Sequence, residues 1–167
     1  MKKQFYHSDY ASNKLQDSIL GILDAVPLWS MATINIDGTC HSNTAYFSFD
    51  EDFNFYFLTP PSTKHSANLS KNSSMAVTVF NTNQPWGENP LQGLQIFGIA
   101  MITDASNEII AHNTYGKRFP NYLEWTNTLS EEERSKLESK FYCFKPTRLK
   151  LIDEQIFGEE KFISLDL

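Results

Sequence analysis

The segment FYFLTPPSTKHSANL (55–69) carries the residue types that bind an anion. A strand pattern ends at Thr59, two prolines follow, and a short helix is predicted over 63–70 with Ser62 as its N-cap. Free N–H groups and the dipole at a helix start favour a negative charge. Thr59, Ser62 and Thr63 add hydroxyl donors, and Lys64 adds a positive charge. The segment predicts a cradle for one phosphate monoester; the alternative is a simple cap beside a solvated lysine.

Because the chain is acidic overall, any such phosphate must be bound by nearby groups and not by the net charge of the protein. Asp and Glu number 20 against 14 Lys and Arg, and this net charge of −6 argues against a nucleic-acid or anionic-membrane partner. The polar N-terminus lacks the apolar core of a signal peptide, and no apolar run approaches a membrane span. The 2 cysteines are too few for a disulfide framework, and the 4 histidines lack metal-ligand spacing. We expect a cytoplasmic protein without a metal site.

The elements that position this segment are mostly strands. The 167 residues suit one domain, 1–167, and 41% hydrophobic residues suffice for a core. Apolar residues at helical spacing predict a helix over 13–25, which Pro27 ends. Strand patterns cover 29–36, 40–49, 53–59, 74–81, 94–103, 141–154 and 155–166. Asp37-Gly38 between the first two strands predicts a hairpin turn with positive φ at both positions.

Further helices are predicted between the later strands. One covers 104–115, and a capping-box pattern at 130–133 opens another that runs to Lys140. Pro146 is expected at a bend or edge of its strand. The sequence predicts an α+β protein built on an antiparallel β-barrel of about six to seven strands with peripheral helices.

The order of these segments resembles the FMN-binding split-barrel superfamily, typified by pyridoxamine 5′-phosphate oxidase. The similarity covers about residues 13–120, through SMATINIDG (30–38), NTAYFSFDED (43–52), the segment 55–69, SMAVTVF (74–80) and GLQIFGIA (93–100). The final segments, LKLIDE (149–154) and FGEEKF (157–162), are similar to the ends of small bacterial members. The resemblance implies an antiparallel split β-barrel that binds FMN.

The resemblance also implies which residues contact the cofactor. The flavin ring would lie along the second hairpin strand, mostly against backbone groups of Ser42, Asn43, Thr44 and Ala45. The phosphate-contacting positions of the family match Leu58, Thr59, Thr63 and Lys64, and Ser62 lies among them. The family's later-strand glutamine matches Gly93, but Gln95, two residues on, points to the same face and is the expected contact.

Two departures from the family pattern bear on function. Ser42 and Phe47 stand where pyridoxamine 5′-phosphate oxidase has an arginine and a lysine, which weakens the case for tight FMN binding. Lys117 and Arg118 either compensate or are cations on a helix's last turn. Trp86 either flanks a ring pocket or covers the barrel end, and His65 either faces the cofactor or lies on the helix surface.

Two classes of function remain open at this point. One is an FMN-dependent oxidoreductase with unknown substrate and unknown catalytic residues, in which the flavin performs the redox step. The other is a non-catalytic flavin or small-ligand binding protein, such as a carrier or a stress-related protein. Heme or a deazaflavin in the same groove is a third possibility. The resemblance further implies a homodimer with the flavin sites at the interface, which the apolar strand 94–102 would suit.

Overall fold

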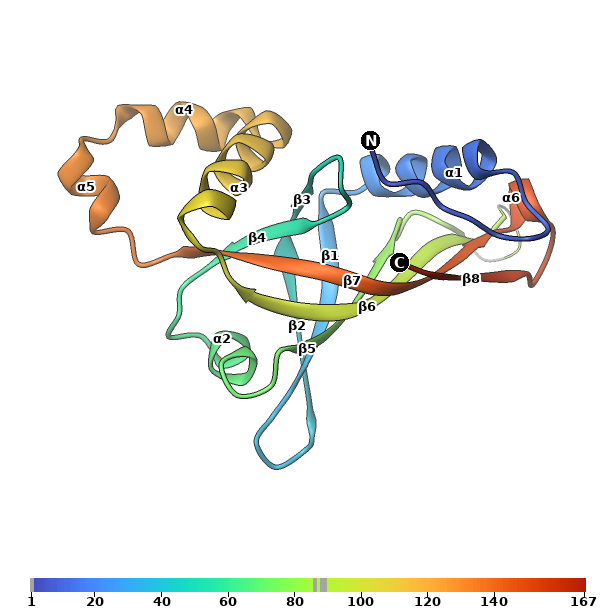
Figure 1. Ribbon diagram of the computed structural model, residues 1–167, viewed down its shortest axis with the longest axis horizontal. Coiled ribbons are helices and arrows are strands. Elements are labelled where there is room, and N and C mark those ends of the chain that lie inside the picture. Colours follow the sequence, from blue (N-terminus) through green and yellow to red (C-terminus); the bar gives the residue numbers. More distant parts are fainter. Residues whose placement is uncertain (1, 86, 88–89) are drawn as a thin grey trace.

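A computed structural model describes residues 2–85, 87 and 90–167. Its helices are α1 (Ser12–Ala25), α2 (Lys64–Leu69), α3 (Ala105–Arg118), α4 (Pro120–Thr128), α5 (Glu131–Ser135) and α6 (Glu154–Phe157). Its strands are β1 (Leu28–Ile34), β2 (Cys40–Tyr46), β3 (Ser48–Phe49), β4 (Phe55–Thr59), β5 (Ser74–Phe80), β6 (Gln92–Ile102), β7 (Lys140–Asp153) and β8 (Phe162–Asp166). The strands form one curled sheet with the helices around it (Figure 1).

The strand order shows how the sheet closes. It runs β2-β1-β5-β6-β7-β4-β3, and β8 pairs with β7. All of these pairings are antiparallel. β2 and β3 lie at opposite ends of the order, although only Phe47 separates them in the chain. One bent segment therefore reaches both edges of the sheet, which confirms the predicted antiparallel split barrel.

A glycine adapts the two longest strands to this curvature. The register of β6 against β7 shifts between Phe97 and Gly98. A Cβ at Gly98 would lie 2.2 Å from the carbonyl oxygen of Lys145, so the backbones approach there more closely than a side chain permits. Gly98 pairs with Pro146, and this irregularity is the bend predicted around that proline.

The barrel interior is largely aromatic. Trp29 and Phe47 stack with ring centroids 4.9 Å apart, and Phe55 contacts both rings at 5.8 and 6.0 Å. These three side chains are at most 1% exposed. Helix α1 packs its apolar face against the same core through Leu15, Ile19, Ile22 and Leu23, as its helical spacing predicts.

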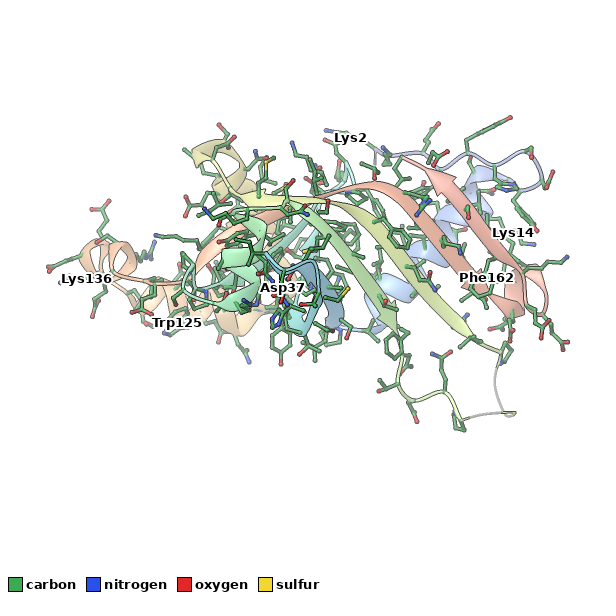
Figure 2. The ribbon with its side chains drawn as sticks, turned by 90° about the horizontal axis from the view of Figure 1, so that it is seen from below. Lys2, Lys14, Asp37, Trp125, Lys136 and Phe162 are labelled. Atoms are coloured by element: carbon green, nitrogen blue, oxygen red, sulfur yellow. The ribbon has the colours of Figure 1, made fainter. Side chains whose placement is uncertain are left out.

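In the C-terminal half, one helix was not predicted and another is shorter than predicted. Helix α4 was not predicted, and within it only Thr126 is buried. The capping box at Ser130 is present, but α5 ends at Ser135, because it buries no residue that would stabilise further turns. Figure 2 shows Trp125 and Lys136, from α4 and just after α5, at one end of the long axis.

The segment predicted as a strand over 155–166 begins as a helix. Asp153 caps α6 by accepting a hydrogen bond from the Ile156 N–H, 3.3 Å away. Gly158 and Glu160 then adopt φ values of 96° and 55°, which a strand does not allow. Only Phe162–Asp166 forms β8. The capping carboxylate and the two positive φ values explain the error.

Candidate functional site

The hairpin of β1 and β2 carries the ring-contact residues predicted from the sequence. Its register pairs Ile34 with Cys40, so the connecting loop spans 35–39. Gly38 has a φ of 82°, but Asp37 does not take the positive φ predicted for it. The Asp37 carboxylate instead accepts hydrogen bonds from the backbone N–H and hydroxyl of Thr39, at 3.0 and 2.6 Å. The hairpin was predicted correctly, while its turn is a longer, side-chain-stabilised loop.

Strand β2 divides its residues between two faces. Ser42 and Thr44 are exposed on the outer face of the sheet, whereas Asn43 and Ala45 are half-buried on the inner face. The Asn43 side-chain oxygen is buried and accepts no hydrogen bond. In the described chain β2 pairs only with β1, so one of its edges keeps backbone N–H and C=O groups outside the sheet ladder. This open edge offers backbone groups to a ligand.

The outer face beside β2 is lined by small side chains. One row across the sheet runs Thr44, Ser30, Thr78 and Gln95, and the next runs Ser42, Ala32, Ala76 and Phe97. Gln95 is exposed on the same face as Thr44, three strand spacings or about 14 Å away. Gly93 shares that face but is buried. The side chains next to β2 (Ser30, Ala32, Ala76 and Thr78) are small, so they leave room for a planar ring beside this strand.

Helix α2 lies on the inner side of the hairpin and begins one residue later than predicted. Thr63, not Ser62, occupies the N-cap position, and its hydroxyl donates to the Pro60 carbonyl at 2.9 Å instead of capping the helix. Ser62 is exposed. The Thr63 hydroxyl therefore lies in hydrogen-bond contact with the Pro60 carbonyl and the Ser66 hydroxyl, at 2.9 and 2.8 Å, and not with a helix N–H.

His65 contacts the hydroxyls that are predicted to bind the phosphate, and His41 stacks on His65. The Nε2 of His65 lies 2.7 Å from the hydroxyl of Thr59 and 3.1 Å from that of Thr63. Its ring stacks against His41 of β2, with centroids 6.4 Å apart and planes 16° apart. His65 is half-buried rather than on the helix surface. This stack places α2 directly against β2, and the sequence gives no signal for it, because His41 and His65 belong to different elements.

Lys64 is exposed at the first residue of α2. The pKa of Asp37 is lowered chiefly by its hydrogen bonds from Thr39, with a smaller contribution from the charge of Lys64. The predicted phosphate corner includes Lys64, the hydroxyls of Thr59 and Thr63, and the imidazole of His65, and Lys140 pairs with Thr59 across the sheet.

The pKa of His65 is lowered, first by burial and second by the charge of His41. The folded-state pKa lies below that of the unfolded chain, so the unfolded state binds more protons and stability falls as pH drops below about 6.5. We expect the loss of melting temperature between about pH 7.5 and about pH 5.5 to be smaller in His65→Gln than in wild type. Thermal unfolding at both pH values measures this, with His7→Gln as control; equal losses in all three proteins would contradict it.

Leu58 does not join Thr59, because successive strand residues face opposite sides. It packs with a second cluster that includes Tyr56, Tyr115 and Phe141. Together with Pro60 it borders a cavity of about 340 Å³ under α4 and α5. Aromatic and charged side chains complete the lining, among them His112, Tyr122, Trp125 and Arg134. This cavity adjoins the end of β4 on the side away from α2.

The remaining candidates lie elsewhere. Lys117 and Arg118 occupy the last turn of α3, as one of the two interpretations predicts, and line a different cavity. Trp86 lies outside the described residues. Among the described residues, no group of His, Cys, Asp or Glu side chains is arranged to hold a metal ion. None of the described helices combines the length and apolar character needed to cross a bilayer.

Fold and site together define a split-barrel protein with an open hairpin edge beside a hydroxyl-rich turn. The family model of pyridoxamine 5′-phosphate oxidase matches residues 15–153, so the chain belongs to this family. No curated protein matches the chain.

Solved structures with the same fold have diverse descriptions. A putative pyridoxamine 5′-phosphate oxidase from Listeria innocua is 16% identical over 82% of this chain and 97% of its own, with a TM-score of 0.60. The heme storage protein HutZ from Vibrio cholerae is 14% identical over 90% and 94%, with a TM-score of 0.62. General Stress Protein 26 from Bacillus anthracis is 17% identical over 92% and 98%, with a TM-score of 0.58. At these identities the likeness shows the fold alone.

Proposed function

We propose that this protein binds FMN at the open edge of β2 and acts as an FMN-dependent oxidoreductase on a small-molecule substrate. The observation that carries the proposal is the adjacency of that backbone edge to the β4–α2 turn, fixed by the stack of His41 on His65. The small outer-face side chains around Thr44 provide room for a planar ring. Membership of the pyridoxamine 5′-phosphate oxidase family supports the same cofactor.

The chain's own residues would bind and orient this cofactor. Lys64 supplies the positive charge for the phosphate, and the hydroxyls of Thr59 and Thr63 can turn from His65 toward its oxygens. Ser42, Asn43, Thr44 and Ala45 offer backbone groups of the open β2 edge to the ring. Gln95 is the proposed contact from β6, and Leu58 and Ser62 border the phosphate turn. Bound FMN would supply hydride or electron transfer.

Lys64→Ala is expected to weaken FMN binding about tenfold, because a charge-assisted hydrogen bond to the phosphate is lost. Quenching of flavin fluorescence during titration with purified protein measures the affinity. Lys71→Ala is the matched control, since Lys71 is also exposed but follows the C-terminal end of α2. Unchanged affinity in Lys64→Ala, or equal losses in both variants, would contradict the proposed phosphate site.

Redox activity is tested on the loaded protein. If the protein is an oxidoreductase, NADH or NADPH should bleach the visible absorbance of its bound flavin under anaerobic conditions. This reduction should be much faster than the reduction of free FMN. If the protein binds FMN but neither nicotinamide reduces it, the non-catalytic carrier or stress-related role is favoured instead.

Heme is a second candidate ligand, favoured by the pairing of His41 with His65 and by the fold shared with a heme storage protein. An axial role for His65 would require its Nε2 to leave both threonine hydroxyls. The family match supports a flavin, so we place FMN first. A hemin titration that produces a sharp Soret band lost in His65→Ala, with no FMN binding, would reverse this order.

We also propose that the protein is a homodimer that completes its flavin sites at the interface. Ile99 and Met101 of β6 expose 38% and 50% of their surface on the outer face of the sheet. Sedimentation should give about twice the chain's 19.2 kDa at micromolar concentration. Met101→Lys should shift the population toward monomer, because the lysine would be buried without a partner. A monomeric wild type would refute the proposed dimer.

A further inference from the structure

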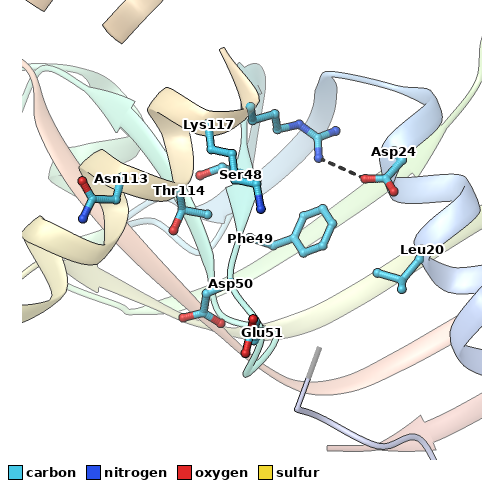
Figure 3. A pocket seen from close by; sticks show the side chains of 10 residues that line it. Leu20, Asp24, Ser48, Phe49, Asp50, Glu51, Asn113, Thr114 and Lys117 are labelled. Carbon is cyan, nitrogen blue, oxygen red and sulfur yellow. Dashed lines mark ion pairs between the residues drawn. The ribbon is translucent and has the colours of Figure 1, made fainter. Parts of the chain in front are cut away.

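A second cavity lies between α1, β3 and α3, on walls that do not include any residue proposed to bind FMN. Its volume is about 570 Å³, and Leu20 and Phe49 form its apolar part. Polar and charged side chains surround these two, as Figure 3 shows for Asp24, Asp50, Glu51 and Lys117. The cavity combines an apolar floor with charges of both signs.

Ser48 is the buried polar group of this cavity. The residue is 0% exposed, and its hydroxyl has no hydrogen-bond partner. A buried hydroxyl without a hydrogen bond destabilises a protein by about 1–3 kcal/mol, so a hydrogen-bond partner for Ser48 would be stabilising. Because Ser48 lines the cavity, a ligand in the cavity can supply that partner.

Arg118 is fixed in place beside Ser48. Its Nη2 donates to the carbonyls of Leu23 and Val26 at 2.6 and 2.8 Å, and its guanidinium lies 4.6 Å from the Phe47 ring centroid. Its Nη1 lies 3.8 Å from the carboxylate of Asp24, beyond hydrogen-bond distance. The guanidinium is therefore oriented by backbone carbonyls and ion-paired with Asp24, while its Nη1 donates no hydrogen bond within the described chain and can donate one to a ligand.

The other charges of the cavity are not neutralised by one another. Within the described chain, neither Lys117 nor Glu51 takes part in an ion pair of 4.0 Å or less. Asp50 already accepts hydrogen bonds from Asp52, Asn54 and Tyr56. A simple anion would lie among three carboxylates, and a simple cation would leave Lys117 and Arg118 without an anionic partner in the ligand, so a ligand that carries both charges matches the lining better.

We propose that this cavity binds a small zwitterion with a carboxylate, an ammonium group and an apolar side chain, that is, a free amino acid. The carboxylate accepts the Ser48 hydroxyl and N–H groups of Lys117 and Arg118. The ammonium group faces Glu51 and Asp24, and the apolar side chain packs against Leu20 and Phe49. The site would sense or carry such a molecule independently of the flavin.

Titration calorimetry with L-phenylalanine, 3-phenylpropionate and 2-phenylethylamine tests the proposal on the full chain. We expect L-phenylalanine to bind at least about tenfold more tightly than either single-charge analogue, because each analogue leaves one set of charges unmet. Binding of an analogue as tightly as L-phenylalanine, or no binding of L-phenylalanine, would overturn the proposal.

Substitutions of residues that line the cavity test whether L-phenylalanine binds there. Lys117→Gln and Ser48→Ala should each weaken L-phenylalanine binding about fivefold or more. Lys136→Gln, at an exposed lysine beyond α5, should not change it. Lys117 is exposed, so its variant tests the site even if Ser48→Ala unfolds. Retained affinity in Lys117→Gln would overturn the assignment. FMN affinity should stay unchanged in Lys117→Gln, which separates this site from the proposed flavin site.

Discussion

Replacing Phe55 with alanine is expected to lower the free energy of unfolding by about 3–5 kcal/mol, the usual loss for a large aromatic in a packed core. Phe55 is 0% exposed. Its ring has neighbouring rings on several sides, with centroid distances of 4.7 Å to Phe53, 5.8 Å to Trp29 and 6.1 Å to Phe144. These neighbours come from three segments of the barrel, so the cavity cannot close by movement of one element.

Urea denaturation of wild type and variant measures the loss. Phe162→Ala is the matched control, since it removes the same ring from a position that is 54% exposed on β8, and it should change stability by less than about 1 kcal/mol. Similar losses in the two variants would show that the barrel interior does not contribute as the packing implies.

Thr44→Arg is expected to weaken FMN binding at least about 100-fold, or about 2.7 kcal/mol. Thr44 is exposed on the outer face of β2, beside the small side chains of Ser30 and Ala32. An arginine there would cover the surface on which we propose the ring rests, and displacing its long side chain costs binding energy. Flavin fluorescence quenching measures the affinity, and thermal unfolding verifies that the variant is folded.

Ser164→Arg gives the comparison for this prediction. Ser164 is exposed on β8 and belongs to the same row of the same sheet face, joined to Gln95 through Lys150. The added charge and size are identical, but the position lies far from β2, so FMN affinity should be retained. A folded Thr44→Arg protein that binds FMN as wild type does would refute the proposed ring position.

Much of the fold could be predicted because its signals are local. The apolar spacing of α1, the Asp37-Gly38 hairpin and the strand at 74–81 each depend on residues close in sequence. Errors arose where tertiary contacts decide the conformation. Helix α4 is short and packs mainly through Tyr122, and the second hairpin strand breaks at Phe47 because that ring is buried in the core.

In the candidate site, too, the features set by local sequence could be predicted, and those set by tertiary contacts could not. The hydroxyls of Thr59 and Thr63 and the charge of Lys64 were evident from the segment 55–69. Their pairing with His65 was not, because a histidine two residues beyond a cap can point toward solvent as readily as toward a strand. The position of β2 against α2 decides it, through the ring of His41.

The sequence alone determined helix α1, most of the antiparallel strands, the family and the residues of the proposed phosphate turn, since these follow from local pattern and shared order. The tertiary structure alone decided which edge of the sheet stays open, which faces Asn43 and Thr44 occupy, and that Ser48 and Arg118 meet at a separate cavity. Such relations join residues far apart in the chain, and only the closure of the barrel brings them together.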